Sequence, residues 1–151
     1  MIRAGVLPMA LGCLQGDAHS IEAKRNALCL LQRISTTSRA QQPMLSSGVL
    51  EVLAPFISSG SSDTNSDETC SLLAALAAAP LIPIDKRGND PLAKVRMRKE
   101  IYKSICVALR LSLDGQSGEQ VSFQPYELAL AIRHLCLHKT HRKALHEAGC
   151  V

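Results

Sequence analysis

The strongest constraint on the fold is a glycine junction that recurs along the chain. Gly5–Pro8 (GVLP) is followed 43 residues later by Gly48–Glu51 (GVLE), and apolar residues continue in phase after both. A third junction, Ala148–Val151 (AGCV), places its glycine another 101 residues on, so three units averaging 48 residues fit between the first and the last. Repeats of about 40–47 residues that contain two or three helices are typical of α-solenoids.

Composition predicts an all-α fold with no β-sheet. Hydrophobic residues make up 46% of the 151 residues, whereas aromatic residues make up only 3% and Trp is absent. Leu and Ala predominate and favour helices, while strands favour β-branched and aromatic side chains. No segment shows a sustained alternation of apolar and polar residues, which is the pattern of a half-buried strand.

Helical periodicity and capping residues predict helices between the junctions. Ser20 is a candidate N-cap, Pro80 stops one helix, and Pro125 opens another in its first turn. The predicted helices span residues 21–35, 67–79, 92–113, 125–137 and 142–148.

Three polar stretches interrupt this pattern and are interpreted as insertions on one face of the stack. They are the Ser-rich insertion 58–66, the Pro-rich loop 80–91 and the Gly-bearing stretch 114–122. The Ser-rich insertion is either a flexible spacer, which is the simpler interpretation, or a phosphorylation target.

In three places the chain resembles the armadillo repeat family. Residues 4–8 (AGVLP) match the start of the family unit, 27–34 (ALCLLQRI) its long helix, and 142–149 (RKALHEAG) its acidic-Ala-Gly end. The resemblance implies a right-handed α-solenoid of about three irregular armadillo-like repeats. These would span 1–47, 48–91 and 92–151, the last including the start of a further unit.

One branch of that family grips basic localisation peptides with a ladder of Trp and Asn side chains. The Trp positions here carry Cys29, Ser71 and Leu130, and the Asn positions carry Arg33, Ala75 and His134. Because no rung of the ladder is present, the sequence argues against nuclear-import-adaptor activity.

The six cysteines favour a reducing compartment. Cys29, Cys70, Cys106 and Cys136 fall inside Leu/Ala-rich helices, and no CxxC pair occurs, so we expect reduced core thiols. The prediction is a cytoplasmic protein, with the nucleus as alternative. Residues 4–14 could also pass for a signal peptide, although a helix of the repeat is the favoured interpretation. No stretch reaches the roughly 18 apolar residues of a membrane span.

The predicted partner-binding residues are Arg96, Lys99, Lys103 and Arg110. On a wheel of 100° per residue they fall within roughly a 60° sector of the predicted helix 92–113. The resemblance places this helix along a groove, where a cationic stripe would suit an acidic or extended partner segment. The alternative is a set of ordinary solvated charges.

A second group, His134, Cys136, His138, His141, His146 and Cys150, lacks the paired ligand spacing of zinc sites. The favoured interpretation of this region is a basic helix end made by Arg133, His138, Lys139, His141, Arg142 and Lys143. Nucleophile-elbow, P-loop, GxGxxG, HExxH and kinase patterns are all absent from the sequence. We therefore predict that the chain is not an enzyme and that it binds no metal or cofactor.

The sequence thus predicts a non-catalytic protein–protein interaction scaffold that belongs to a longer repeat array, with a protein partner of unknown identity. Both ends lie at the same phase of the repeat without a polar cap, so self-association through open ends is a further expectation. Two alternatives stay open. The chain has a net charge of +4 and could bind the phosphate backbone of nucleic acid weakly, or it could be the regulatory arm of a larger enzyme.

Overall fold

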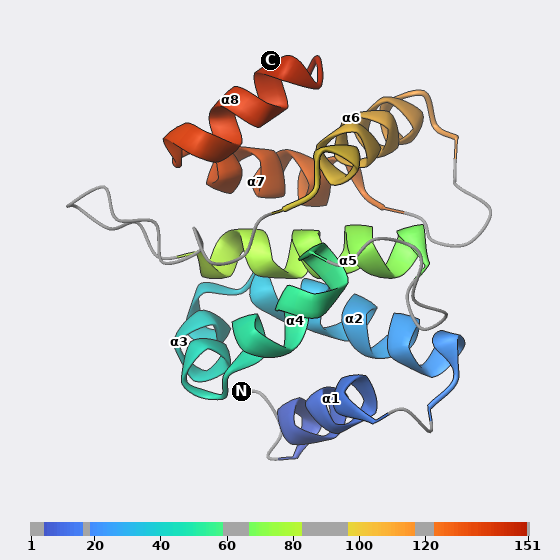
Figure 1. Ribbon diagram of the computed structural model, residues 1–151, viewed down its shortest axis with the longest axis vertical. Coiled ribbons are helices and arrows are strands. Elements are labelled where there is room, and N and C mark those ends of the chain that lie inside the picture. The colour runs from blue at the N-terminus through green and yellow to red at the C-terminus, as the bar shows by residue number, and fades with distance from the viewer. Residues whose placement is uncertain (1–4, 17–18, 59–66, 83–96, 117–122, 151) are drawn as a thin grey trace.

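The computed structural model describes residues 5–16, 19–58, 67–82, 97–116 and 123–150, and within these ranges the chain is helical without a strand. The all-α prediction is therefore confirmed for the described residues. Figure 1 shows α1 at one end of the long axis and α8 at the other, with α5 across the middle. In chain order they are α1 (Val6–Gln15), α2 (Ile21–Ser35), α3 (Ser38–Ser46), α4 (Val49–Ser58), α5 (Glu68–Ala78), the short 3-10 helix η1 (Ala79–Leu81), α6 (Lys99–Leu113), α7 (Pro125–Cys136) and α8 (Lys139–Glu147).

Local sequence explains how several helices begin. Ser20 caps α2, because the Ala23 N–H donates to its Oγ at 3.2 Å. In α7 the Gln124 N–H donates to the Glu127 carboxylate at 3.0 Å, as one half of a capping box. The predicted helices 21–35 and 125–137 are confirmed to within one residue.

The recurring glycines occupy equivalent turns of the backbone. Gly5, Gly48 and Gly149 have φ angles of 100°, 71° and 84°, a region that glycine enters without steric cost. Gly48 lies between α3 and α4, and Gly149 follows α8. Both α3 and α8 have nine residues and end two residues before their glycine. The three glycines therefore share a positive-φ backbone, which Gly115 also adopts.

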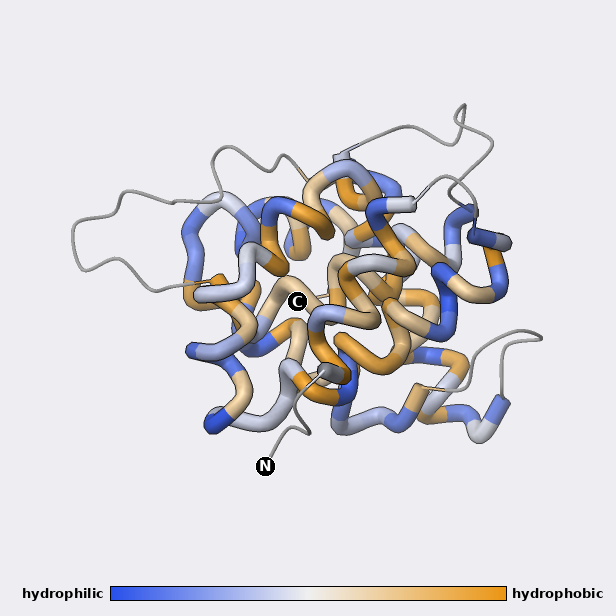
Figure 2. Tube along the Cα trace, turned by 90° about the horizontal axis from the view of Figure 1, so that it is seen from below, coloured by the Kyte–Doolittle hydropathy of each residue, from blue (hydrophilic) through white to orange (hydrophobic). Residues whose placement is uncertain are grey.

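The helices pack around one continuous core. The centre is formed by α2 and α5, which lie side by side; α1 packs on α2, α4 on α5, and α6 and α8 on α7. All eight α-helices contribute apolar side chains to the same cluster. In Figure 2 the hydrophobic stretches gather in the middle of the molecule and the hydrophilic ones lie outside.

The middle of the stack is α5, which is buried on all sides. Every residue from Cys70 to Ile82 is buried, including Ser71 at 2% and Ala75 at 0% exposure. A helix that is apolar all round finds its place inside a core rather than at a surface.

Several elements differ from the sequence prediction. The predicted helices include neither α3, which contains Pro43, nor α4. The long helix starts at Lys99 instead of 92, since Arg98 is extended (ψ 147°), and 92–96 lie outside the described residues. The last helix starts at Lys139, three residues earlier than predicted. The predicted insertions 58–66, 80–91 and 114–122 fall largely outside the described ranges.

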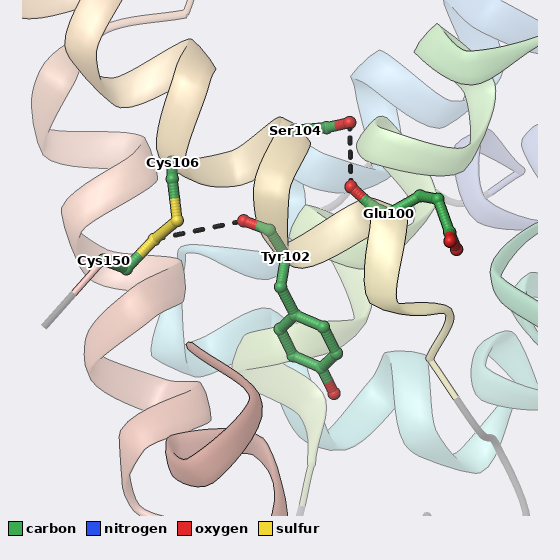
Figure 3. Close-up of a disulfide and its surroundings, with 5 residues drawn as sticks. All are labelled: Glu100, Tyr102, Ser104, Cys106 and Cys150. Carbon is green, nitrogen blue, oxygen red and sulfur yellow. Dashed lines mark hydrogen bonds between the residues drawn. A yellow bond between two sulfur atoms is a disulfide. The ribbon is translucent and has the colours of Figure 1, made fainter. Parts of the chain in front are cut away.

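The prediction of reduced thiols is wrong for one pair. Cys106 on α6 forms a disulfide with Cys150, just after α8, across a Cα–Cα distance of 5.4 Å (Figure 3). These residues are 44 apart in the chain, and only the packing of α6 against α8 brings them together. Cys70 is buried and reduced, and Cys13, Cys29 and Cys136 are half-buried free thiols.

Candidate functional site

Three of the four predicted partner-binding residues lie on one side of α6. Lys99, Lys103 and Arg110 are exposed, whereas Arg96 lies outside the described residues. Spacings of four and seven residues place the three within about 40° of each other around the helix axis. In the described parts of the chain, none of them forms an ion pair. Two exposed acids border them: Glu100 beside Lys99, and Asp114 one turn after Arg110.

Two exposed apolar side chains share that side of the helix. Val107 is 55% exposed and lies between Lys103 and Arg110, while Leu113 is 68% exposed and lies one turn further on. Sequence reasoning missed both. Their spacings of eight and fourteen residues from Lys99 place Val107 about 40° to one side of the three cations and Leu113 about 40° to the other, within a sector of about 120°. We name Lys99, Lys103, Val107, Arg110 and Leu113 the α6 stripe.

The rest of α6 is fixed to its neighbours. The Tyr102 hydroxyl lies 2.6 Å from Nδ1 of His141 on α8, and both side chains are buried. The Ser112 hydroxyl donates to the Phe123 carbonyl, 2.7 Å away, just before α7. Cys106 lies seven residues after Lys99, so its disulfide with Cys150 (Figure 3) holds α6 on the same side as the α6 stripe. The α6 stripe is therefore presented by a helix whose position is already set.

The first turn of α6 carries an unfavourable charge arrangement. Arg98 occupies the N-cap position without a side-chain cap, and Lys99 is the first helical residue. Cations near a helix N-terminus oppose the helix dipole, and the favourable acid here is Glu100. The Arg98 guanidinium donates to the Ser71 hydroxyl at 3.0 Å. Lys99 is exposed, so packing does not explain why a cation stands at this position.

A small cavity of about 170 Å³ lies between α5 and the start of α6. Its lining combines two carboxylates, of Glu68 and Glu100, with the Arg98 guanidinium, and the Ser104 hydroxyl donates to Glu68 at 2.8 Å. Small-molecule sites usually measure about 300–1,000 Å³. The cavity is therefore smaller than a typical substrate pocket.

In chain order α6 follows α5 and precedes α7, and it packs on both α7 and α8. The ladder positions Ser71 and Ala75 on α5 are buried, which leaves no exposed side chain in the middle of the expected groove. The candidate surface is thus the outer side of one helix.

The His/Cys group is largely used in packing. His141 is buried against Tyr102, its ring lies 5.8 Å from that of His138, and Cys150 belongs to the disulfide. Burial, together with Arg133 and His138, lowers the pKa of His134. In the ranges that the structure describes, no three His, Cys, Asp or Glu residues are grouped closely enough to hold a metal ion.

Comparison with known proteins gives no relative. No protein-family model matches the chain, and neither a curated protein nor a solved structure does. Among the described helices, none combines the length and the apolar character that crossing a lipid bilayer requires.

Proposed function

We propose that this chain is a non-catalytic protein–protein interaction module that binds an acidic segment of a partner on the α6 stripe. We further propose that its helices form an irregular, right-handed armadillo-like α-solenoid of about three units. The glycine turns at Gly5, Gly48 and Gly149 support this architecture, as do the successive pairs α1–α2, α4–α5 and α6–α7.

The observation that carries the binding proposal is the set of three exposed cations on one line of α6, none of which forms an ion pair with another described residue. Exposed cations steer and orient an oppositely charged partner more than they stabilise a fold. Lys99 even opposes the helix dipole, so a binding role accounts for its position better than a structural role does.

A second candidate is phosphate-backbone binding to nucleic acid, which one observation favours. Residues 97–116 and 123–150 carry eight lysines and arginines against four acids, whereas 5–16, 19–58 and 67–82 carry four of each. Base stacking has little support, because Tyr126 is the one large exposed aromatic side chain in the described residues. Such binding would fall steeply with salt.

Charge reversal tests the proposal. The triple variant Lys99→Glu/Lys103→Glu/Arg110→Glu is compared with Arg33→Glu/Arg39→Glu/Arg142→Glu, which reverses three exposed cations elsewhere. Affinity purification at physiological salt with quantitative mass spectrometry should recover partners with the wild type and the control, but not with the stripe variant. The melting temperature of Lys99→Glu alone should stay level or rise, because an acid suits the N-terminus of α6. Recovery of the same partners at the same yield by the stripe variant would refute the proposal.

A further inference from the structure

We infer that the partner segment is an acidic amphipathic α-helix that lies along α6, an inference that rests on the proposed function and names its ligand. Three features of the α6 stripe lead to it: the spacing of its charges, the apolar side chains among them, and the lack of backbone groups to pair with an extended chain.

The spacing of the charges sets the length of the partner surface. Lys99 and Arg110 are eleven residues apart, about 16 Å along a helix axis at 1.5 Å per residue. A second helix that lies alongside α6 meets these cations with acids at the same four- and seven-residue spacings. Its acids then form a line on one face of the helix.

The apolar members of the α6 stripe require apolar partner residues on the same face. Val107 and Leu113 are more than half exposed between and beyond the cations. A helix whose face alternates acids with leucine-like side chains buries them and pairs the charges in the same contact. A purely acidic, unpatterned segment would leave both apolar side chains in water.

The secondary structure of the ligand follows from what α6 can offer. An extended peptide normally gains affinity by pairing its backbone with a sheet edge, and the described residues contain no strand. A helix satisfies its own backbone hydrogen bonds and needs only side-chain contacts. Since α6 is already held by His141, Phe123 and Cys150, binding does not have to order the protein side of the interface.

The described helices of a second copy of this chain do not offer the acidic face that the α6 stripe requires. Each described helix that has an acid within its bounds has only one, so none presents two acids one turn apart. These single acids are Glu22, Glu51, Glu68, Glu100, Glu127 and Glu147.

The probe is a capped, fluorescein-labelled, alanine-based peptide of about 18 residues, long enough to be partly helical in water. It carries glutamates at i, i+4 and i+11 and leucines at i+8 and i+14, the spacings of the α6 stripe. A peptide of reversed sequence covers the antiparallel orientation. A scrambled peptide of equal composition and a variant with a central proline, which breaks the helix, are the controls.

Fluorescence anisotropy on the full chain gives the readout. The patterned peptide, in at least one orientation, should bind at least about tenfold more tightly than the scrambled and proline peptides. The stripe variant should lose at least about tenfold in affinity and Val107→Ser about threefold, with Arg33→Glu/Arg39→Glu/Arg142→Glu within about twofold of wild type.

The remaining outcomes separate the two proposals. Equal binding of patterned, scrambled and proline peptides would overturn the helical ligand, while partner recovery in the purification still decides the proposed function. Wild-type binding of the patterned peptide by the stripe variant would overturn both the ligand and its site. Stripe-dependent binding of a single-stranded RNA oligonucleotide, with no binding of any peptide, would replace the helical ligand with a nucleic acid.

Discussion

Removing the Asp67 carboxylate tests how the two central helices are joined. Asp67 is the N-cap of α5 and accepts a hydrogen bond from the Cys70 N–H at 2.7 Å. The same side chain forms an ion pair with Arg25 on α2. Because α2 and α5 form the centre of the core, this carboxylate supports both the start of one helix and its contact with the other.

The expected cost of Asp67→Ala is the sum of those two roles. Loss of an N-cap side chain costs about 1 kcal/mol. The ion pair has side-chain exposures of 22% and 32%, and pairs near a surface contribute about 0.2–1 kcal/mol. The free energy of unfolding should therefore fall by about 1.2–2 kcal/mol, which lowers the melting temperature by about 2–8 °C for a chain of this size.

Matched variants separate the two roles. Asp67→Asn keeps a good capping side chain and loses the charge, so it should cost less than Asp67→Ala. Arg25→Met removes only the ion pair and should match Asp67→Asn. Circular dichroism melts of the three variants and the wild type at neutral pH give the comparison.

The pH dependence provides a second check. Burial raises the pKa of the Asp67 carboxyl, but the Cys70 N–H and the Arg25 guanidinium outweigh it and hold the pKa below its usual range. A carboxylate with a depressed folded-state pKa stabilises the fold above about pH 4, and this stabilisation is lost as the pH falls through the folded-state value. The gap between wild type and Asp67→Asn should therefore close in acid. A melting temperature of Asp67→Ala within about 1 °C of wild type would refute the reasoning.

Three other substitutions or treatments have defined outcomes. The double variant Cys106→Ser/Cys150→Ser should lower the free energy of unfolding by about 4 kcal/mol, the loop-closure value for a separation of 44 residues. Dithiothreitol should lower the melting temperature of the wild type but not that of the double variant. A wild-type melting temperature unchanged by dithiothreitol would contradict this prediction. Burial and Asp67 raise the pKa of Cys70 to about 11, so iodoacetamide at neutral pH should label Cys13, Cys29 and Cys136 before Cys70 by mass spectrometry, and early labelling of Cys70 would count against it. Lys24 is 3% exposed and forms no ion pair with another described residue. The variant Lys24→Met keeps the apolar stem, so the free energy of unfolding should change little. A fall of more than about 1 kcal/mol in a denaturant titration would show that the ammonium group has a partner.

Several elements of the fold were predictable because their causes are local. The bounds of α2 and α7 follow from Ser20 as the cap of α2, from Pro125 in the first turn of α7, and from apolar residues at helical spacing. The turns at Gly5, Gly48 and Gly149 follow from the freedom of glycine at positive φ. By contrast, α3 was not predicted, and it continues through Pro43 although proline removes a backbone N–H from a helix.

For the candidate site, too, part was predictable from the sequence and part was decided by tertiary packing. The sequence by itself determined that Lys99, Lys103 and Arg110 share one line of a helix, since a turn of 3.6 residues fixes which side chains lie together. Only the tertiary structure decided that α6 turns this line, with Val107 and Leu113, to solvent and its Tyr102 side to α8. The same packing decided that Cys106 meets Cys150 and that α5 is closed on all sides. Contacts between residues far apart in the chain depend on how whole helices pack, and no local spacing encodes them.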